Sequence, residues 1–255
     1  MTAAGFALTL RANATPERDQ LIADLWDAGT TGITEEDHWV RAFFGAASDP
    51  DSLMQQFADF QPTFEEQEEY DWVKHSQSMW HPFEVGQRFW LVPEWLDDPA
   101  PEGRLRLPIR PGMACGSGWH PATRLCLEAL EQQVTPGVSV LDVGTGSGIL
   151  AEAALLLGAR FVAGCDIDHD ATLVAHANLP ELPLFTGSLR SVKTGAFDMV
   201  VANLNAATIQ NISADLARVA TGPIILSGFR ENEQVLTPRE IQDELELDDW
   251  SCIVC

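Results

Sequence analysis

The strongest constraint on the fold is a regular alternation of apolar runs and helical segments in the second half of the chain. VSVLDVG, FVAGCDID, FDMVVANL and GPIILSGF lie between residues 138 and 229 and are apolar almost throughout. Strands that helices cover on both faces have this continuous apolar character, so the region is predicted to be α/β with a mostly parallel sheet. A last helix, which would contain Pro238, and a last strand over DDWSCIVC are expected to complete it.

The first 62 residues have a different pattern. FALTLRA alternates like a strand, and the helix that follows is expected to have Thr15 as its cap, Pro16 at its first position and Gly29 at its end. A strand-like segment over residues 32–45 and a second helix begun by an Asp–Pro–Asp turn come next. This β-α-β-α order predicts a small α+β domain at 1–62.

The rest of the chain is divided at a turn-rich, acidic stretch, residues 97–103. We expect a linker segment at 63–103 and the α/β domain at 104–255.

A glycine-rich turn, LDVGTGSGIL, follows the first apolar run of the second half. Ligands of open α/β sheets bind at the carboxyl ends of the strands, where glycines allow close approach and a helix start presents amide N–H groups. Asp142, Gly144, Gly146 and Gly148 form the pattern DxGxGxG. A dinucleotide site has GxGxxG instead, and Ile149 stands where its third glycine would be, so a nicotinamide dehydrogenase is disfavoured.

A carboxylate at the end of the next strand strengthens the interpretation. Asp166 lies 22 residues after Gly144, where it can accept hydrogen bonds from both hydroxyls of a ribose. The alternative is an ordinary turn acid, like Asp168 and Asp170. Together with the glycines, Asp166 is typical of a site for S-adenosyl-L-methionine.

The segment before this turn resembles a known family. RPGMACGSGWHPATRLCLEALE, residues 110–131, is similar to the signature of the ribosomal protein methyltransferase family PrmA, which trimethylates large-subunit ribosomal protein eleven. FDMVVANL, with Asn203, and LSGF also resemble that family's strand ends. Cys115, Ser117 and Ala122 stand where the family has Phe, Thr and Thr. The matching positions are Pro111, Gly112, Met113, Ala114, Gly116, Gly118, His120 and Thr123.

The resemblance implies a Rossmann-like, class I S-adenosylmethionine-dependent methyltransferase domain with a seven-stranded sheet, preceded by a ferredoxin-like substrate-recognition domain. It implies methyl transfer to lysine or other amino groups of a basic ribosomal protein, with no metal. Asn203 is expected where the methyl group and the amine meet, and so is the one catalytic residue. The cofactor-binding residues implied are Thr123, Gly144, Gly146, Asp166 and Asn203.

Some residues keep two interpretations. His120 would either shape the acceptor cleft or hold the loop. The side chains of Trp80, Trp90 and Trp95 would either pack between the domains or guide the lysine.

Charge and cysteine content limit the partners and the compartment. The net charge is −23, and residues 1–103 hold 20 acidic and 5 basic side chains, so nucleic-acid binding through a basic face is not expected. The acidic excess is either a solubility surface or a docking face for a basic protein. Five scattered cysteines, the absence of a long apolar run and the N-terminal sequence favour the reducing cytoplasm and no membrane segment. Cys252 and Cys255 are expected to be unrelated core thiols, and the oligomeric state stays open.

Two other functions remain open at this stage. One is a methyltransferase of a different protein or of a small molecule, motivated by Ala122 and the divergent first domain. The other is a partner protein that binds S-adenosylmethionine without turnover.

Overall fold

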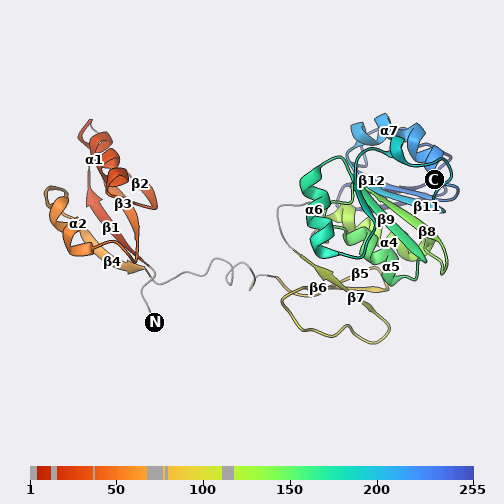
Figure 1. Ribbon diagram of the computed structural model, residues 1–255, viewed down its shortest axis with the longest axis horizontal. Helices are drawn as coiled ribbons and strands as arrows, with labels where there is room; N and C mark the ends of the chain where they lie inside the picture. Colours follow the sequence, from red (N-terminus) through yellow and green to blue (C-terminus); the bar gives the residue numbers. More distant parts are fainter. Residues whose placement is uncertain (1–4, 13–15, 37, 68–76, 78–79, 111–117) are drawn as a thin grey trace. The chain divides into compact units, whose positions relative to one another are not determined.

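The computed structural model describes residues 5–12, 16–36, 38–67, 77, 80–110 and 118–255. The chain divides into two compact units, residues 1–79 and residues 80–255 (Figure 1). Each unit has its own hydrophobic core.

The first unit is a ferredoxin-like α+β domain. Its antiparallel sheet has the order β2-β3-β1-β4, with two helices and a short 3₁₀ turn between the strands. The expected strand at 32–45 is a hairpin of two strands, and a fourth strand completes the sheet. The elements are β1 (Gly5–Arg11), α1 (Pro16–Asp27), β2 (Gly32–Glu36), β3 (Trp39–Gly45), α2 (Pro50–Gln56), η1 (Ala58–Phe60) and β4 (Thr63–Gln67).

Local signals in the sequence account for both helices. α1 begins at Pro16 and is followed by Gly29 in the left-handed conformation, at φ +87°. The expected cap, Thr15, lies outside the described residues. In α2, the side chain of Asp49 accepts a hydrogen bond from the backbone N–H of Asp51, and Pro50 occupies the first turn. The helices cover one face of the sheet, where Leu8, Leu10, Leu21, Leu25 and Val40 form the centre of the core.

The unit boundary differs from the expected linker at 63–103. β4 lies within that range, yet it pairs with β1 and belongs to the first unit. β5 (Phe83–Val85) and β6 (Phe89–Pro93) pair with each other, and β7 (Leu105–Ile109) joins them to form a separate three-stranded sheet of the second unit. β6 and β7 contain no acidic residue, and both carry buried side chains, among them Leu91 and Leu107.

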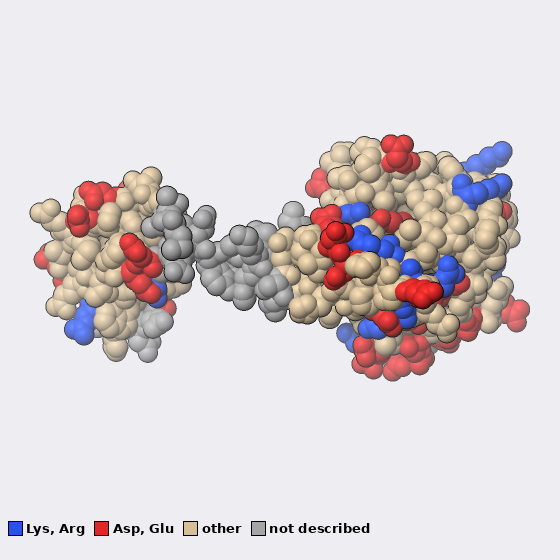
Figure 2. Space-filling view, turned by 90° about the horizontal axis from the view of Figure 1, so that it is seen from below, with Lys and Arg blue, Asp and Glu red and all other residues tan. Residues whose placement is uncertain are grey.

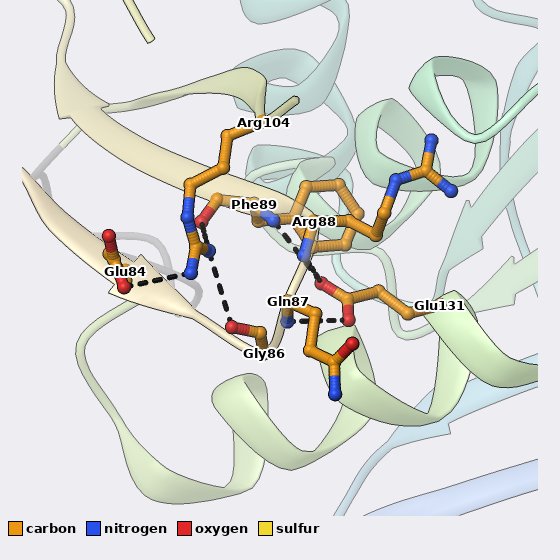
Figure 3. A network of polar contacts seen from close by, with 7 residues as sticks. All are labelled: Glu84, Gly86, Gln87, Arg88, Phe89, Arg104 and Glu131. Atoms are coloured by element: carbon orange, nitrogen blue, oxygen red, sulfur yellow. Dashed lines mark hydrogen bonds and ion pairs between the residues drawn. The ribbon is translucent and has the colours of Figure 1, made fainter. Parts of the chain in front are cut away.

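A carboxylate from the second unit's first helix fixes this small sheet. Glu131 lies in α4 (Pro121–Gln133), and its carboxylate accepts three backbone N–H groups from the β5–β6 turn (Figure 3). Gly86 in the turn has φ +54°, and a Cβ there would lie 2.5 Å from Oε2 of Glu131, so only glycine fits. Arg104 closes the turn from the other side by donating to the carbonyls of Gly86 and Phe89 and to Glu84. The three donors to Glu131 are Gln87, Arg88 and Phe89.

The second unit is built on a seven-stranded sheet of order β10-β9-β8-β11-β12-β14-β13. All neighbours are parallel except β14, which runs antiparallel to both β12 and β13. The strand order reverses between β8 and β11, which is where such sheets bind ligands. The strands are β8 (Ser139–Val143), β9 (Phe161–Asp166), β10 (Leu184–Thr186), β11 (Met199–Asn203), β12 (Ile224–Arg230), β13 (Asp243–Leu247) and β14 (Trp250–Val254).

Helices cover both faces of this sheet, as the apolar runs predicted (Figure 1). α4 and α5 (Ile149–Leu156) pack on one face, and α7 (Ala206–Val219) packs on the other. α6 (His169–Asn178) lies beside β9 and β10, and the 3₁₀ turn η2 (Leu189–Ser191) contacts α7. Successive residues of each central strand alternate between the two cores, so these strands are apolar on both faces apart from Ser139, Asp142 and Asn203.

The expected last helix is wrong. Residues 231–242 form no helix, and DELEL is strand β13 in a hairpin with β14. Asp248 and Asp249 both have positive φ, +50° and +63°, which is the geometry of a tight two-residue hairpin turn. Pro238 opposes a helix here, and the alternation on both sides of Asp-Asp is a hairpin pattern.

The expected last strand is confirmed as β14. Cys252 and Cys255 lie in the two different cores, as expected for residues three apart on a strand. Among the described residues, no helix has the length and apolar character needed to cross a bilayer.

Candidate functional site

The glycine-rich turn at the end of β8 adopts a backbone that favours glycine. Gly144, Gly146 and Gly148 have φ values of +72°, +53° and +86°. The N–H groups of Gly144 and Thr145 donate to the carbonyl of Cys165 at 2.8 and 3.0 Å, which ties the turn to β9. Gly148 is the N-cap of α5 and provides no side-chain cap. The turn therefore presents a fixed backbone at the carboxyl edge of the sheet.

Glycine is also required for the close approach of three strand ends. A Cβ on Gly144 would lie 2.4 Å from a methyl group of Leu204, the residue after β11. Gly228 in β12 has φ +97°, and a Cβ there would lie 2.5 Å from the carbonyl oxygen of Leu204. The ends of β8, β11 and β12 therefore meet around Leu204.

Asp166 ends β9 beside this turn, as expected. Oδ2 accepts the N–H of Gly146 at 3.2 Å, and Oδ1 accepts the N–H of Asp168 at 3.0 Å. A carboxylate offers about four acceptor positions, so each oxygen keeps capacity for a further donor. This pair of acceptor oxygens fits a ribose diol, which needs two adjacent acceptors.

Asn203 and Thr123 are brought together from positions 80 residues apart. Asn203 ends β11, and its Nδ2 donates to Oγ1 of Thr123 at 3.1 Å. Thr123 lies in the first turn of α4 and is 2% exposed. One amide N–H of Asn203 is donated to Thr123, and the carboxamide oxygen is the acceptor that this side chain offers.

His120 has a structural role as the N-cap of α4. Its Nδ1 accepts the N–H of Ala122 at 3.2 Å, and its ring lies edge-on to Trp250 with centroids 4.3 Å apart. Burial, and to a lesser extent the positive charge of Arg230, lower the pKa of His120. The neutral ring keeps the Nδ1 lone pair that caps the helix.

Part of the resembling loop cannot be compared with the structure. Pro111, Gly112, Met113, Ala114 and Gly116 lie outside the described residues.

The predicted tryptophans lie in different surroundings. Trp80 lies edge-on to Trp119 at 5.9 Å, and Trp119 is 56% exposed. Trp90 lies in β6, and Trp95 follows that strand. Packing of these side chains between the domains stays a prediction.

Asp142 belongs to the site but was not among the predicted site residues. It is 1% exposed at the end of β8, and its Oδ2 accepts Oγ1–H of Thr145 at 2.8 Å and N–H of Ala151 at 3.2 Å. Ala151 is in the first turn of α5, so Asp142 caps that helix from a distance. Desolvation raises the pKa of Asp142 to about 7. The signal in the sequence was an acid inside an otherwise apolar strand, SVLDV.

The fold and these strand ends define a Rossmann-like class I methyltransferase, the class that uses S-adenosyl-L-methionine. The family model of ribosomal protein L11 methyltransferase (PrmA) matches residues 2–255. The chain therefore belongs to that family. Among the described residues, no group of three or more His, Cys, Asp or Glu side chains is placed to hold a metal ion.

Individual relatives agree with this assignment. The "Ribosomal protein L11 methyltransferase" of Methylobacillus flagellatus is 36% identical over 248 residues, which are 93% of this chain and 83% of that protein. The protein of the same name from Cupriavidus taiwanensis is 43% identical over 170 residues, 65% of this chain and 57% of that protein. The chain thus spans only slightly more than half of the Cupriavidus relative's length. The crystal structure of a ribosomal protein L11 methylase from Lactobacillus delbrueckii subsp. bulgaricus has a TM-score of 0.61 and 27% identity, covering 69% of this chain and 97% of that one.

Proposed function

We propose that this chain transfers methyl groups from S-adenosyl-L-methionine to amino groups, including lysine side chains, of large-subunit ribosomal protein eleven. The supporting observation is the Asn203–Thr123 pair at the switch point of the sheet. It orients a carboxamide oxygen beside the glycine turn, where an amine that approaches the cofactor needs an acceptor for its N–H. The family to which the chain belongs supports the same reaction.

The cofactor is proposed to lie across the ends of β8 and β9. Gly144 and Gly146 give it backbone room, and Asp166 accepts hydrogen bonds from its ribose hydroxyls. Thr123 acts through Asn203, since their hydrogen bond fixes the amide at the end of β11.

The chemistry requires a neutral amine in line with the transferable methyl group. The bound cofactor supplies that methyl group on a positively charged sulfur. A lysine has a pKa of about 10.4, so deprotonation at neutral pH costs about 4–5 kcal/mol. Partial desolvation of the amine lowers that cost. Orientation of the amine by Asn203 contributes part of the roughly 7–11 kcal/mol by which correct positioning of two reactants can lower the reaction barrier.

The first unit is proposed to recognise the protein substrate. The face of its sheet that the helices leave uncovered holds a depression of about 300 Å³ lined by Thr9, Thr34, Trp39, Arg41 and Thr63. On the face seen in Figure 2, acidic side chains are spread over both units, which suits a basic partner. A ribosomal substrate and reduced buried cysteines both fit a location in the cytoplasm.

Intact-mass spectrometry tests this function. Purified ribosomal protein eleven, incubated with this protein and S-adenosylmethionine, is expected to gain the mass of one or more methyl groups. Trp39→Ala should raise KM for the protein substrate and leave cofactor affinity unchanged. An unmodified substrate, with cofactor binding retained, would contradict the proposed acceptor.

A further inference from the structure

The carboxyl group of Asp142 has a bonding arrangement that capping alone does not explain. Oδ2 satisfies the Thr145 hydroxyl and the Ala151 amide, but Oδ1 is buried and has no hydrogen-bond partner among the described residues. An unpartnered oxygen of a buried carboxylate is costly, and protonation relieves that cost. The side chain lies directly beneath the glycine turn proposed to hold the cofactor.

Among the described side chains, none with a positive charge acts on Asp142. Cys126 of α4 lies on the same face of the sheet as Asp142, Cys165 of β9 lies on the opposite face, and the charge of Asp166 at the end of β9 also acts on Asp142. The thiol of Cys126 forms a side-chain hydrogen bond with the thiol of Cys252 in β14.

No ion pair joins Asp142 to a described Lys, Arg or His. The contacts that favour its ionised form are the hydrogen bonds from the Thr145 hydroxyl and from the Ala151 N–H at the start of α5. Asp142 is thus a buried acid that a nearby cation would ionise.

We propose that binding of the cationic cofactor at the glycine turn makes Asp142 release its proton to solvent, so that cofactor affinity is coupled to pH through this residue. The O–H bond of the carboxyl group breaks, the proton passes to water or buffer, and the carboxylate remains opposite the cofactor's positive charge. The inference rests on the cofactor part of the proposed function and does not depend on the methyl acceptor.

The direction of the pH dependence follows from charge. A cation binds the ionised form better, so affinity rises with pH and levels off above the pKa of the free protein, about 7. For each pH unit by which the cofactor lowers the pKa of Asp142, cofactor affinity should rise about tenfold from below the lowered pKa to above the pKa of the free protein. A one-unit shift would release about 0.4 proton per site near pH 7 and almost none near pH 9.

Calorimetry measures this release directly. S-adenosylmethionine is titrated into the intact protein near pH 7 and near pH 9 in two buffers of different ionisation enthalpy, because their difference in binding heat counts the protons released. Asp142→Asn keeps the shape of the side chain and should remove the Asp142 share of the release. Asp170→Asn makes the same charge change in the exposed first turn of α6 and should leave the release intact. Proton release from any other group is common to all three proteins.

The outcomes separate this inference from the proposed function. Release near pH 7 that disappears in Asp142→Asn supports it, and so does the predicted rise of affinity with pH in the unaltered protein. Cofactor binding with equal proton release in the unaltered protein and Asp142→Asn would overturn it while leaving methyl transfer possible. Proton release without methylation of ribosomal protein eleven would overturn the proposed acceptor instead.

Discussion

Replacement of Asp166 by alanine is expected to weaken cofactor binding about 10- to 150-fold. Its two oxygens each accept one backbone N–H and retain capacity for the ribose hydroxyls. A hydrogen bond to a charged group contributes about 1.5–3 kcal/mol, and 1.4 kcal/mol corresponds to a factor of ten. Loss of one such hydrogen bond gives the tenfold end of this range. Water can enter the partly exposed space that the Asp166 carboxylate leaves, so the loss of binding free energy stays below the sum for two hydrogen bonds.

Isothermal titration calorimetry with S-adenosylmethionine measures this loss. Circular dichroism and thermal unfolding should show that the fold is intact, because the amides of Gly146 and Asp168 can turn to water. Asp170→Ala is the matched control, an exposed acid four residues later whose loss should change affinity less than twofold. Unchanged affinity of a folded Asp166→Ala protein would refute the placement of the ribose.

Three further changes test other parts of the site. Asn203→Ala should lower turnover about 100-fold while changing cofactor affinity much less, measured by steady-state kinetics and calorimetry, and equal losses in both would make it a scaffold residue. Glu131→Ala should lower the free energy of unfolding of the second unit by about 2–4 kcal/mol in urea, because three backbone N–H groups lose their acceptor, and Glu131→Gln should lose less. The carboxyl of Asp142 has a pKa raised from 3.8 to about 7, so the folded state holds the extra proton between these pH values. Its ionisation should therefore lower the free energy of unfolding by up to about 4 kcal/mol as pH rises from 3.8 to about 7, and Asp142→Asn should remove that decrease. Urea unfolding at several pH values measures both proteins. The same pH profile for both would contradict the raised pKa of Asp142.

The parts of the fold that could be predicted are those with a strong local pattern. The apolar runs between residues 138 and 229 are strands because helices cover both faces of the sheet. The glycine turn and Asp166 could be predicted because the turn comes directly after one such strand and Asp166 is the last residue of the next.

The parts that were missed depend on contacts between distant segments. From the sequence alone no strand is predicted at β13, because its pairing with β14 decides its conformation and its own side chains are mostly exposed. β5 is only three residues long, and the turn between β5 and β6 depends on hydrogen bonds to Glu131, more than 40 residues later. The hydrogen bond between Thr123 and Asn203 spans 80 residues, so no local pattern could show it.

Transfer of a radiolabelled methyl group from S-adenosylmethionine tests the central claim most directly. Purified ribosomal protein eleven and a whole lysate from a strain lacking this protein would be offered side by side. Label in ribosomal protein eleven, strongly reduced by Asn203→Ala, is the predicted result. Label in a different protein would contradict the proposed substrate, and cofactor binding without label in any protein would contradict the proposed methyl transfer to protein.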